Sequence, residues 1–132
     1  MENLAKKILI SETIQPPDSC LQQFDENFPG AINIDWFKKE HYYEAIFYKD
    51  DIEHIAYYSA EGHLESYKMF LPTKFIPESI KRMLERKGEI MNVVLINKGN
   101  SINYEVIIRN QNLCRYLILL TDLGKVISEM QL

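Results

Sequence analysis

One structural plan occurs twice in this chain. A Tyr-Glu pair followed by apolar residues stands at Tyr43-Glu44 and again at Tyr104-Glu105, and each copy is followed by a second strand-like run and then a glycine. The repeat distance is 60 residues at the helix start (Pro17 to Pro77) and 62 at the final glycine (Gly62 to Gly124). A drift this small is expected from single-residue insertions in loops, which leave the regular elements intact.

Each copy begins with a helix signal. Pro16-Pro17-Asp18-Ser19 suits a first helical turn, and Cys20 or Leu21, Phe24 and Phe28 then follow at helical spacing until Pro29-Gly30. In the second copy Pro77-Glu78-Ser79 takes the same place, and the apolar stripe is Ile76, Ile80, Met83 and Leu84. Each half therefore contributes one short amphipathic helix.

Period-two alternation predicts four strands after each helix. In the first half Ile32, Ile34 and Trp36 should share the buried face of a strand, and further strands are expected at about Tyr42 to Lys49, Ile52 to Ser59 and His63 to Phe70. In the second half strands are expected at about Met91 to Lys98, Ile102 to Asn110, Leu113 to Thr121 and Lys125 to Gln131, with Gln111-Asn112 as one of the turns.

The prediction is an α+β protein: two tandem α-β-β-β-β repeats form one antiparallel sheet of about eight strands with both helices on one face. The expected divisions are a lead-in at residues 1–15, a first repeat at 16–71 and a second at 72–132, folding as one cooperative domain.

A two-residue hairpin at Asp50-Asp51 fixes which residues share a face. It places Phe47 opposite His54, Ala45 opposite Ala56 and Ile46 opposite Ile55. The face with Tyr43, Ala45 and Phe47, and by the repeat that with Tyr104, Val106 and Ile108, is assigned to the helix-covered core. The opposite face is predicted to bind a partner through Ile46, Tyr48, Ile55, Tyr57, Ile107, Tyr116 and Ile118. Two alternatives are that the N-terminal segment covers this face and that a shifted register exchanges the faces.

The composition argues against several classes of function. With 132 residues, 46% of them hydrophobic, the chain can build a core, and its net charge of −4 with scattered Lys and Arg does not suggest a nucleic-acid partner. The N-terminal apolar stretch is too short for a membrane span. His41, His54 and His63 lack the companions of a zinc site, so no metal or cofactor is expected, although weak calcium binding at Asp50, Asp51 and Glu53 stays open. The sequence has no GxSxG elbow and no phosphate-binding glycine loop, which predicts that it is not an enzyme.

The motifs resemble those of the PepSY-like, β-lactamase-inhibitor-protein-like (BLIP-like) small proteins of Bacteroidetes-type bacteria. The resemblance rests on Phe28-Pro29-Gly30-Ala31, the Tyr-Glu strands, Glu61-Gly62 and Asp122-Leu123-Gly124, and covers about Pro16 to Leu132. It implies tandem αβ4 repeats, a periplasmic or cell-surface location and binding of other proteins by the uncovered sheet face. The second half departs from it with Gly88-Glu89 at the helix exit, and the chain as given has no signal peptide, so a cytoplasmic location stays open.

These observations predict a non-catalytic binding module that contacts a protein or peptide through the uncovered aromatic sheet face. The alternative is a homo-oligomeric structural or regulatory protein that uses the same face as its self-interface. A concentration-independent dimer in solution would favour the alternative.

Overall fold

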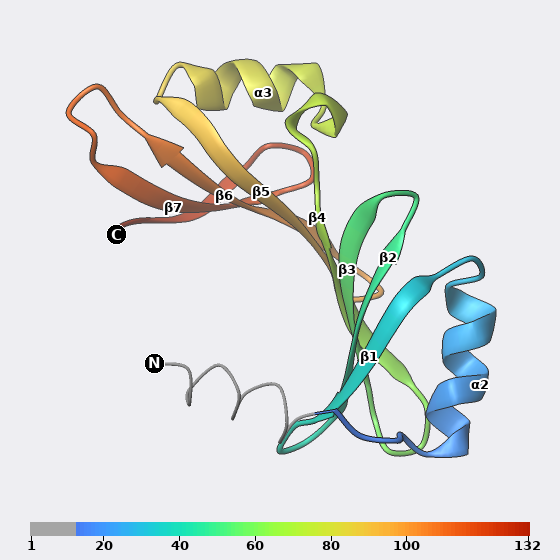
Figure 1. Ribbon diagram of the computed structural model, residues 1–132. Helices are drawn as coiled ribbons and strands as arrows, with labels where there is room; N and C mark the ends of the chain where they lie inside the picture. The colour runs from blue at the N-terminus through green and yellow to red at the C-terminus, as the bar shows by residue number, and fades with distance from the viewer. Residues whose placement is uncertain (1–12) are drawn as a thin grey trace, which may run out of the picture. The chain divides into compact units, whose positions relative to one another are not determined.

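The computed structural model describes residues 13–132, so the predicted lead-in falls mostly outside the described residues. The elements, in chain order, are α2 (Asp18–Asn27), β1 (Ile32–Lys38), β2 (Tyr43–Lys49), β3 (Ile52–Tyr58), β4 (Leu64–Phe70), a 3₁₀ turn η1 (Thr73–Phe75), α3 (Glu78–Glu85), β5 (Glu89–Asn97), β6 (Ile102–Arg109), β7 (Arg115–Thr121) and β8 (Val126–Gln131). The eight strands form one sheet in sequence order (Figure 1). The α+β class, the tandem repeat and the eight-stranded antiparallel sheet are therefore confirmed.

The chain divides into two compact units. Unit 1 ends at Tyr67 and unit 2 begins at Lys68, so the division falls within β4. Each unit has its own helix and its own buried core.

Aromatic side chains dominate the core of unit 1. The Phe24 ring of α2 lies 4.8 Å from that of Phe47 and 5.5 Å from those of Phe28 and Trp36, measured between ring centroids. His54 belongs to this core: its ring stacks on Phe47, its Nδ1 lies 2.8 Å from the Ile52 carbonyl oxygen, and burial lowers its pKa. The predicted stripe of α2 is therefore the buried one, and His54 is a core residue.

The hairpin of β2 and β3 has the predicted register. Tyr43 pairs with Tyr58, Ala45 with Ala56, Ile46 with Ile55 and Phe47 with His54. Asp50 and Asp51 both have positive φ angles, 53° and 64°, which a two-residue type I′ turn requires and which Asp tolerates better than most residues. Because the turn has only two residues, the sequence alone determined the pairing.

The prediction for β1 was wrong at its first residues. Ile32 pairs with Tyr48 and Asp35 with Ile46, so β1 has one residue more than β2 between these pairs, and Asn33 takes a left-handed φ of 55°. This bulge turns Ile32 away from the core, and 59% of Ile32 is exposed, whereas Trp36 is buried as predicted. Alternation counted through a bulge assigns the preceding residues to the wrong face.

Three contacts join the start of α2 to the turn between β3 and β4. The Ser19 hydroxyl donates to the Ala60 carbonyl at 3.1 Å, and the Cys20 thiol donates to the Ser59 carbonyl at 3.2 Å. Gly62 has a φ of 89°, and a Cβ there would lie 2.6 Å from the Ser19 carbonyl oxygen. Only glycine permits both this backbone conformation and this close approach. We call these contacts the α2 clasp.

Unit 2 repeats the plan with an aliphatic core. Ile80 and Leu84 of α3 pack with Ile76 against the inner face of β5, β6 and β7, which contributes Val93, Tyr104, Val106, Ile108, Ile118 and Leu120. Gly88, which replaces the Phe-Pro-x-Ala exit of the first half, packs so closely that a Cβ would lie 2.5 Å from the Arg109 carbonyl oxygen. The departure of the second half from the motif thus has a packing reason.

Candidate protein-binding face

Four of the predicted partner-binding residues lie together on the face of unit 1 opposite its core. Ile46 and Tyr48 alternate along β2 with the buried Ala45 and Phe47, and Ile55 and Tyr57 alternate along β3 with the buried Ala56. Side chains of successive strand residues point to opposite faces, so these four point away from α2. Tyr48 is 41% exposed.

Cross-strand pairing arranges this face in three rows across β1, β2 and β3. The first row is Ile32, Tyr48 and Glu53; the second is Asp35, Ile46 and Ile55; the third is Phe37, Glu44 and Tyr57. Each row contains one carboxylate and two apolar or aromatic side chains, and each carboxylate comes from a different strand. We call these nine residues the acidic-aromatic face.

Lys39 and Tyr42 contact side chains of the third row. Lys39 Nζ lies 3.8 Å from Glu44 Oε1 and 5.9 Å from the centroid of the Phe37 ring. The Tyr42 ring packs edge-on against Tyr57, with centroids 4.9 Å apart. Burial, followed by the charge of Glu44, raises the pKa of Tyr57 to about 12. In this row the chain itself supplies a cation between a carboxylate and an aromatic ring.

The ionisation of Tyr57 provides a test of this row. Because the pKa of Tyr57 is raised from 10.0 to about 12, its neutral form is favoured in the folded state, and its contribution to stability is present below pH 10 and is lost as the pH rises through about 12. We expect Glu44→Gln to lower the pKa of Tyr57 without returning it to 10.0, since burial remains. Ultraviolet titration, with Tyr57→Phe to identify the transition, measures this; an unchanged pKa in Glu44→Gln would contradict the arrangement.

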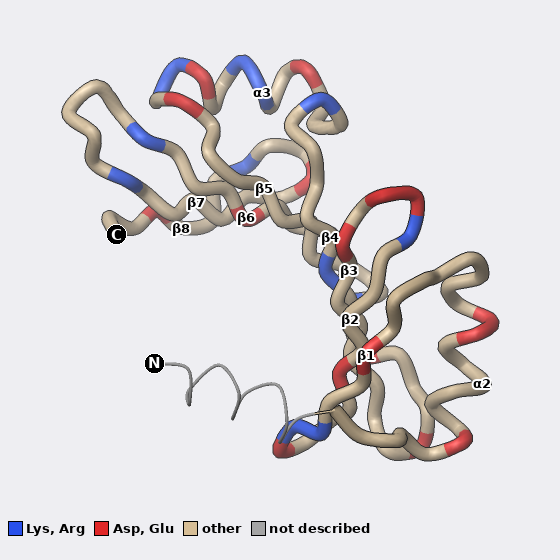
Figure 2. Tube along the Cα trace, in the orientation of Figure 1, with Lys and Arg blue, Asp and Glu red and all other residues tan. Residues whose placement is uncertain are grey.

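The two units differ strongly in charge. Residues 13–67 contain three Lys and eleven Asp or Glu, a net charge of 3 − 11 = −8, whereas residues 68–132 contain ten Lys or Arg and six Asp or Glu, a net charge of 10 − 6 = +4. Acidic positions recur through unit 1, and basic ones recur on α3 and on β6 and β7 of unit 2 (Figure 2). The whole-chain charge of −4 conceals this polarity.

In unit 2 the predicted side of the sheet was right for Ile107 and wrong for Tyr116 and Ile118. Ile118 pairs with Val106 and is fully buried, and Tyr116 pairs with Ile108 and packs against the same core. Leu117, which pairs with Ile107, and Leu119, which pairs with Glu105, hold the outer positions instead.

The physical reason is the length of the loop between β6 and β7. A two-residue turn at Gln111-Asn112 would pair Ile107 with Tyr116, but the observed register pairs Arg109 with Arg115 and leaves one residue more in the loop. The Asn110 side chain accepts hydrogen bonds from the amides of Asn112 and Cys114, at 2.9 and 3.0 Å, and Leu113 takes a φ of 63°. A shift of one residue in the register moves every side chain of β7 to the opposite face of the sheet.

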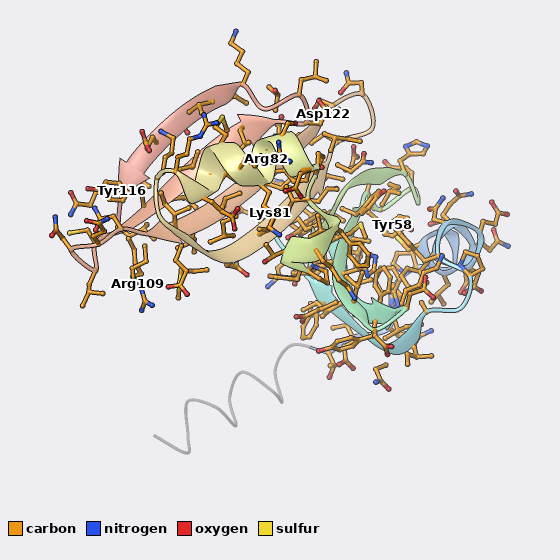
Figure 3. All side chains as sticks on the ribbon, turned by 90° about the horizontal axis from the view of Figure 1, so that it is seen from above. Tyr58, Lys81, Arg82, Arg109, Tyr116 and Asp122 are labelled. Carbon is orange, nitrogen blue, oxygen red and sulfur yellow. The ribbon has the colours of Figure 1, made fainter. Side chains whose placement is uncertain are left out.

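The outer face of unit 2 is less acidic than that of unit 1. Glu105 lies between Val94 and Leu119, and at the far end of the strands Arg109 forms a 2.7 Å ion pair with Glu89 opposite Arg115. Figure 3 labels Arg109 and Tyr116 at this end and Lys81 and Arg82 on α3. Carboxylates and cations therefore balance on the outer face of unit 2.

Sequence reasoning missed Ile32, Asp35, Phe37, Glu44 and Glu53 as members of the unit 1 face. The hairpin register that located Tyr57 also places Glu44 and Glu53 on this face. Extending the same strand pairing to β1 would have added Asp35, so all three carboxylates could have been predicted. Within residues 13–132, no group of three or more His, Cys, Asp or Glu side chains is placed to hold a metal ion. No helix of that part of the chain is long and apolar enough to cross a membrane.

No family model matches the sequence, and no curated protein matches it either. Solved structures do match, each with a TM-score of 0.78. A BLIP-like protein from Bacteroides fragilis is 17% identical, with 90% of this chain and 88% of that chain covered. A DUF2874 family protein from Bacteroides uniformis and a protein from Bacteroides eggerthii proposed to be periplasmic are each 18% identical, with 89% and 90% covered. This chain shares their fold. The predicted resemblance to BLIP-like proteins of Bacteroidetes-type bacteria is thereby confirmed for the architecture.

Proposed function

We propose that this protein is a non-catalytic binding module that contacts another protein through the acidic-aromatic face of unit 1. The observation that supports it most directly is the exposure of large apolar side chains on the side of the sheet opposite α2, where a one-sided sheet ordinarily carries polar residues. Ile32 and Tyr48 are 59% and 41% exposed and are paired with each other across β1 and β2. Contiguous apolar and aromatic surface of this kind is typical of protein interfaces.

The comparisons favour the same class of function. One neighbour in fold is described as BLIP-like, and another is proposed to be periplasmic. We therefore propose a partner in the bacterial envelope, with this protein in the periplasm or at the cell surface. The rival function, self-association through the same face, is less favourable because two copies face to face would bring six carboxylates together in a desolvated interface.

Site-specific photocrosslinking tests this function. A benzophenone amino acid replaces Ile32, Ile46 or Tyr48 on the face and, as matched controls, Gln22, Gln23 or Glu26 on the exposed side of α2. We expect one discrete crosslinked protein from the three face positions and none from the controls, in cells that produce the protein.

Three results would count against the proposal. Equal crosslinking from α2 would show that the face is not the contact surface. A product of twice the chain's mass, containing this chain alone, would establish self-association. An intramolecular product joined to residues 1–12 would mean that the chain covers its own face.

A further inference from the structure

Among residues 13–132, the acidic-aromatic face has three carboxylates, of which Glu44 forms an ion pair with Lys39. Among residues 13–132, neither Asp35 nor Glu53 takes part in an ion pair, and Glu44 has Lys39. The other two lysines of residues 13–67, Lys38 and Lys49, form no ion pair with this face. The first and second rows therefore each hold a carboxylate that has no ion-pair partner among residues 13–132.

From this we propose that the partner of the face is a protein segment rich in arginine, whose side chains fill the first and second rows. The inference rests on the proposed function and names the chemistry of the partner at the same site. A partner that buries the face with neutral side chains would bury Asp35 and Glu53 as unpaired charges, which costs several kcal/mol for each carboxylate. A cationic partner avoids this cost, and the net charge of −8 over residues 13–67 attracts it from a distance.

The third row contains a cation near both a carboxylate and an aromatic ring, and this arrangement is a guide to what a partner could supply in the other two rows. There Lys39 lies between the Glu44 carboxylate and the face of the Phe37 ring. In the first row Glu53 is paired with Tyr48, which is 41% exposed, so a carboxylate and an exposed aromatic ring again lie on neighbouring strands. In the second row Asp35 lies beside Ile46, which can pack against the aliphatic part of a long basic side chain.

Arginine suits these rows better than lysine does. Its planar guanidinium can donate two parallel hydrogen bonds to a carboxylate and stack on a tyrosine ring at the same time. An ammonium group is held more strongly by water and offers no flat face. The face should therefore discriminate between two cations of equal charge.

Three peptides of the same length test this. In the first, arginine alternates with valine; in the second, lysine replaces arginine; in the third, citrulline, which is uncharged and nearly the same shape, replaces it. Calorimetry with the full chain at low salt measures the affinity. We expect the arginine peptide to bind about tenfold more tightly than the citrulline peptide, with the lysine peptide between them.

A pair of double variants places the binding on the face. Asp35→Asn with Glu53→Gln removes two charges from the rows, whereas Asp50→Asn with Asp51→Asn removes two charges from the hairpin tip, where asparagine tolerates the positive φ angles. We expect the first variant to lose about tenfold in affinity for the arginine peptide, and the second to change it less than about twofold. Thermal unfolding confirms that both remain folded.

The possible outcomes distinguish binding at the face from general attraction of a cationic peptide by the net charge of the protein. Equal losses in the two variants would mean attraction by net charge alone and would overturn the inference. Equal binding of the citrulline and arginine peptides, abolished by Ile46→Ser with Ile55→Ser, would also overturn it but would leave the face as a binding site. Absence of binding by all three peptides would overturn the arginine preference. Photocrosslinking would still test independently whether the face contacts another protein.

Discussion

Phe24→Ala is expected to lower the free energy of unfolding of unit 1 by about 4 kcal/mol. Phe24 is only 2% exposed, and its ring contacts those of Phe28, Trp36, Phe47 and Tyr58, with centroids between 4.8 and 6.4 Å away. Alanine removes the one ring that touches all four others, and a cavity lined by rigid aromatic rings cannot collapse easily. Urea unfolding, followed by tryptophan fluorescence from Trp36, measures the change.

The control for this substitution is Gln23→Ala, one residue earlier on the exposed side of α2. It should change the free energy of unfolding by less than about 0.5 kcal/mol. Similar losses for both variants would mean that α2 contributes by its helical propensity and that the aromatic cluster does not hold it on the sheet.

Ile118→Ala is expected to destabilise the protein by about 3 kcal/mol, whereas Leu117→Ala should cost about 1 kcal/mol or less. The two residues are neighbours on β7 and are similar in size. Ile118 is fully buried against Val106 and the α3 side of the core, whereas Leu117 lies on the outer face beside Ile107. The difference arises from the side of the sheet on which each residue lies. Thermal and urea unfolding of the two variants measures it.

This comparison also tests the loop between β6 and β7. A larger loss of stability for Leu117→Ala than for Ile118→Ala would support a two-residue turn at Gln111-Asn112. In that register Tyr116 and Ile118 would lie on the outer face. Asn110→Ala provides a further check, because it removes the side-chain acceptor that holds the longer loop.

Unit 1 was more predictable than unit 2 because of its turns. Asp50 and Asp51 occupy a turn whose length leaves one possible register, so the pairs of β2 and β3 followed from the sequence. The loop from Asn110 to Cys114 contains several residues that favour turns, and its length is decided by side-chain hydrogen bonds of Asn110 that alternation does not report. An error of one residue there exchanged the faces of β7.

The composition of the candidate site was harder to predict than its location. Ile46, Tyr48, Ile55 and Tyr57 were placed correctly from alternation, but the bulge in β1 concealed that Ile32 joins them. The acidic character of the face was also concealed, because unit 2 offsets half of the charge of unit 1 in the total for the chain. Net charge is informative for a site only when it is counted over the unit that forms the site.

The α2 clasp has a consequence for the order in which unit 1 folds. Its contacts join Ser19 to Ala60 and Cys20 to Ser59, which are 41 and 39 residues apart in sequence, whereas the hairpin of β2 and β3 needs only its two-residue turn. Closing a long loop costs more chain entropy than closing a short one, and it becomes cheaper once the hairpins have already shortened the path. The hairpin should therefore form early and helix docking late, so that substitutions in the clasp accelerate unfolding while leaving the folding rate nearly unchanged.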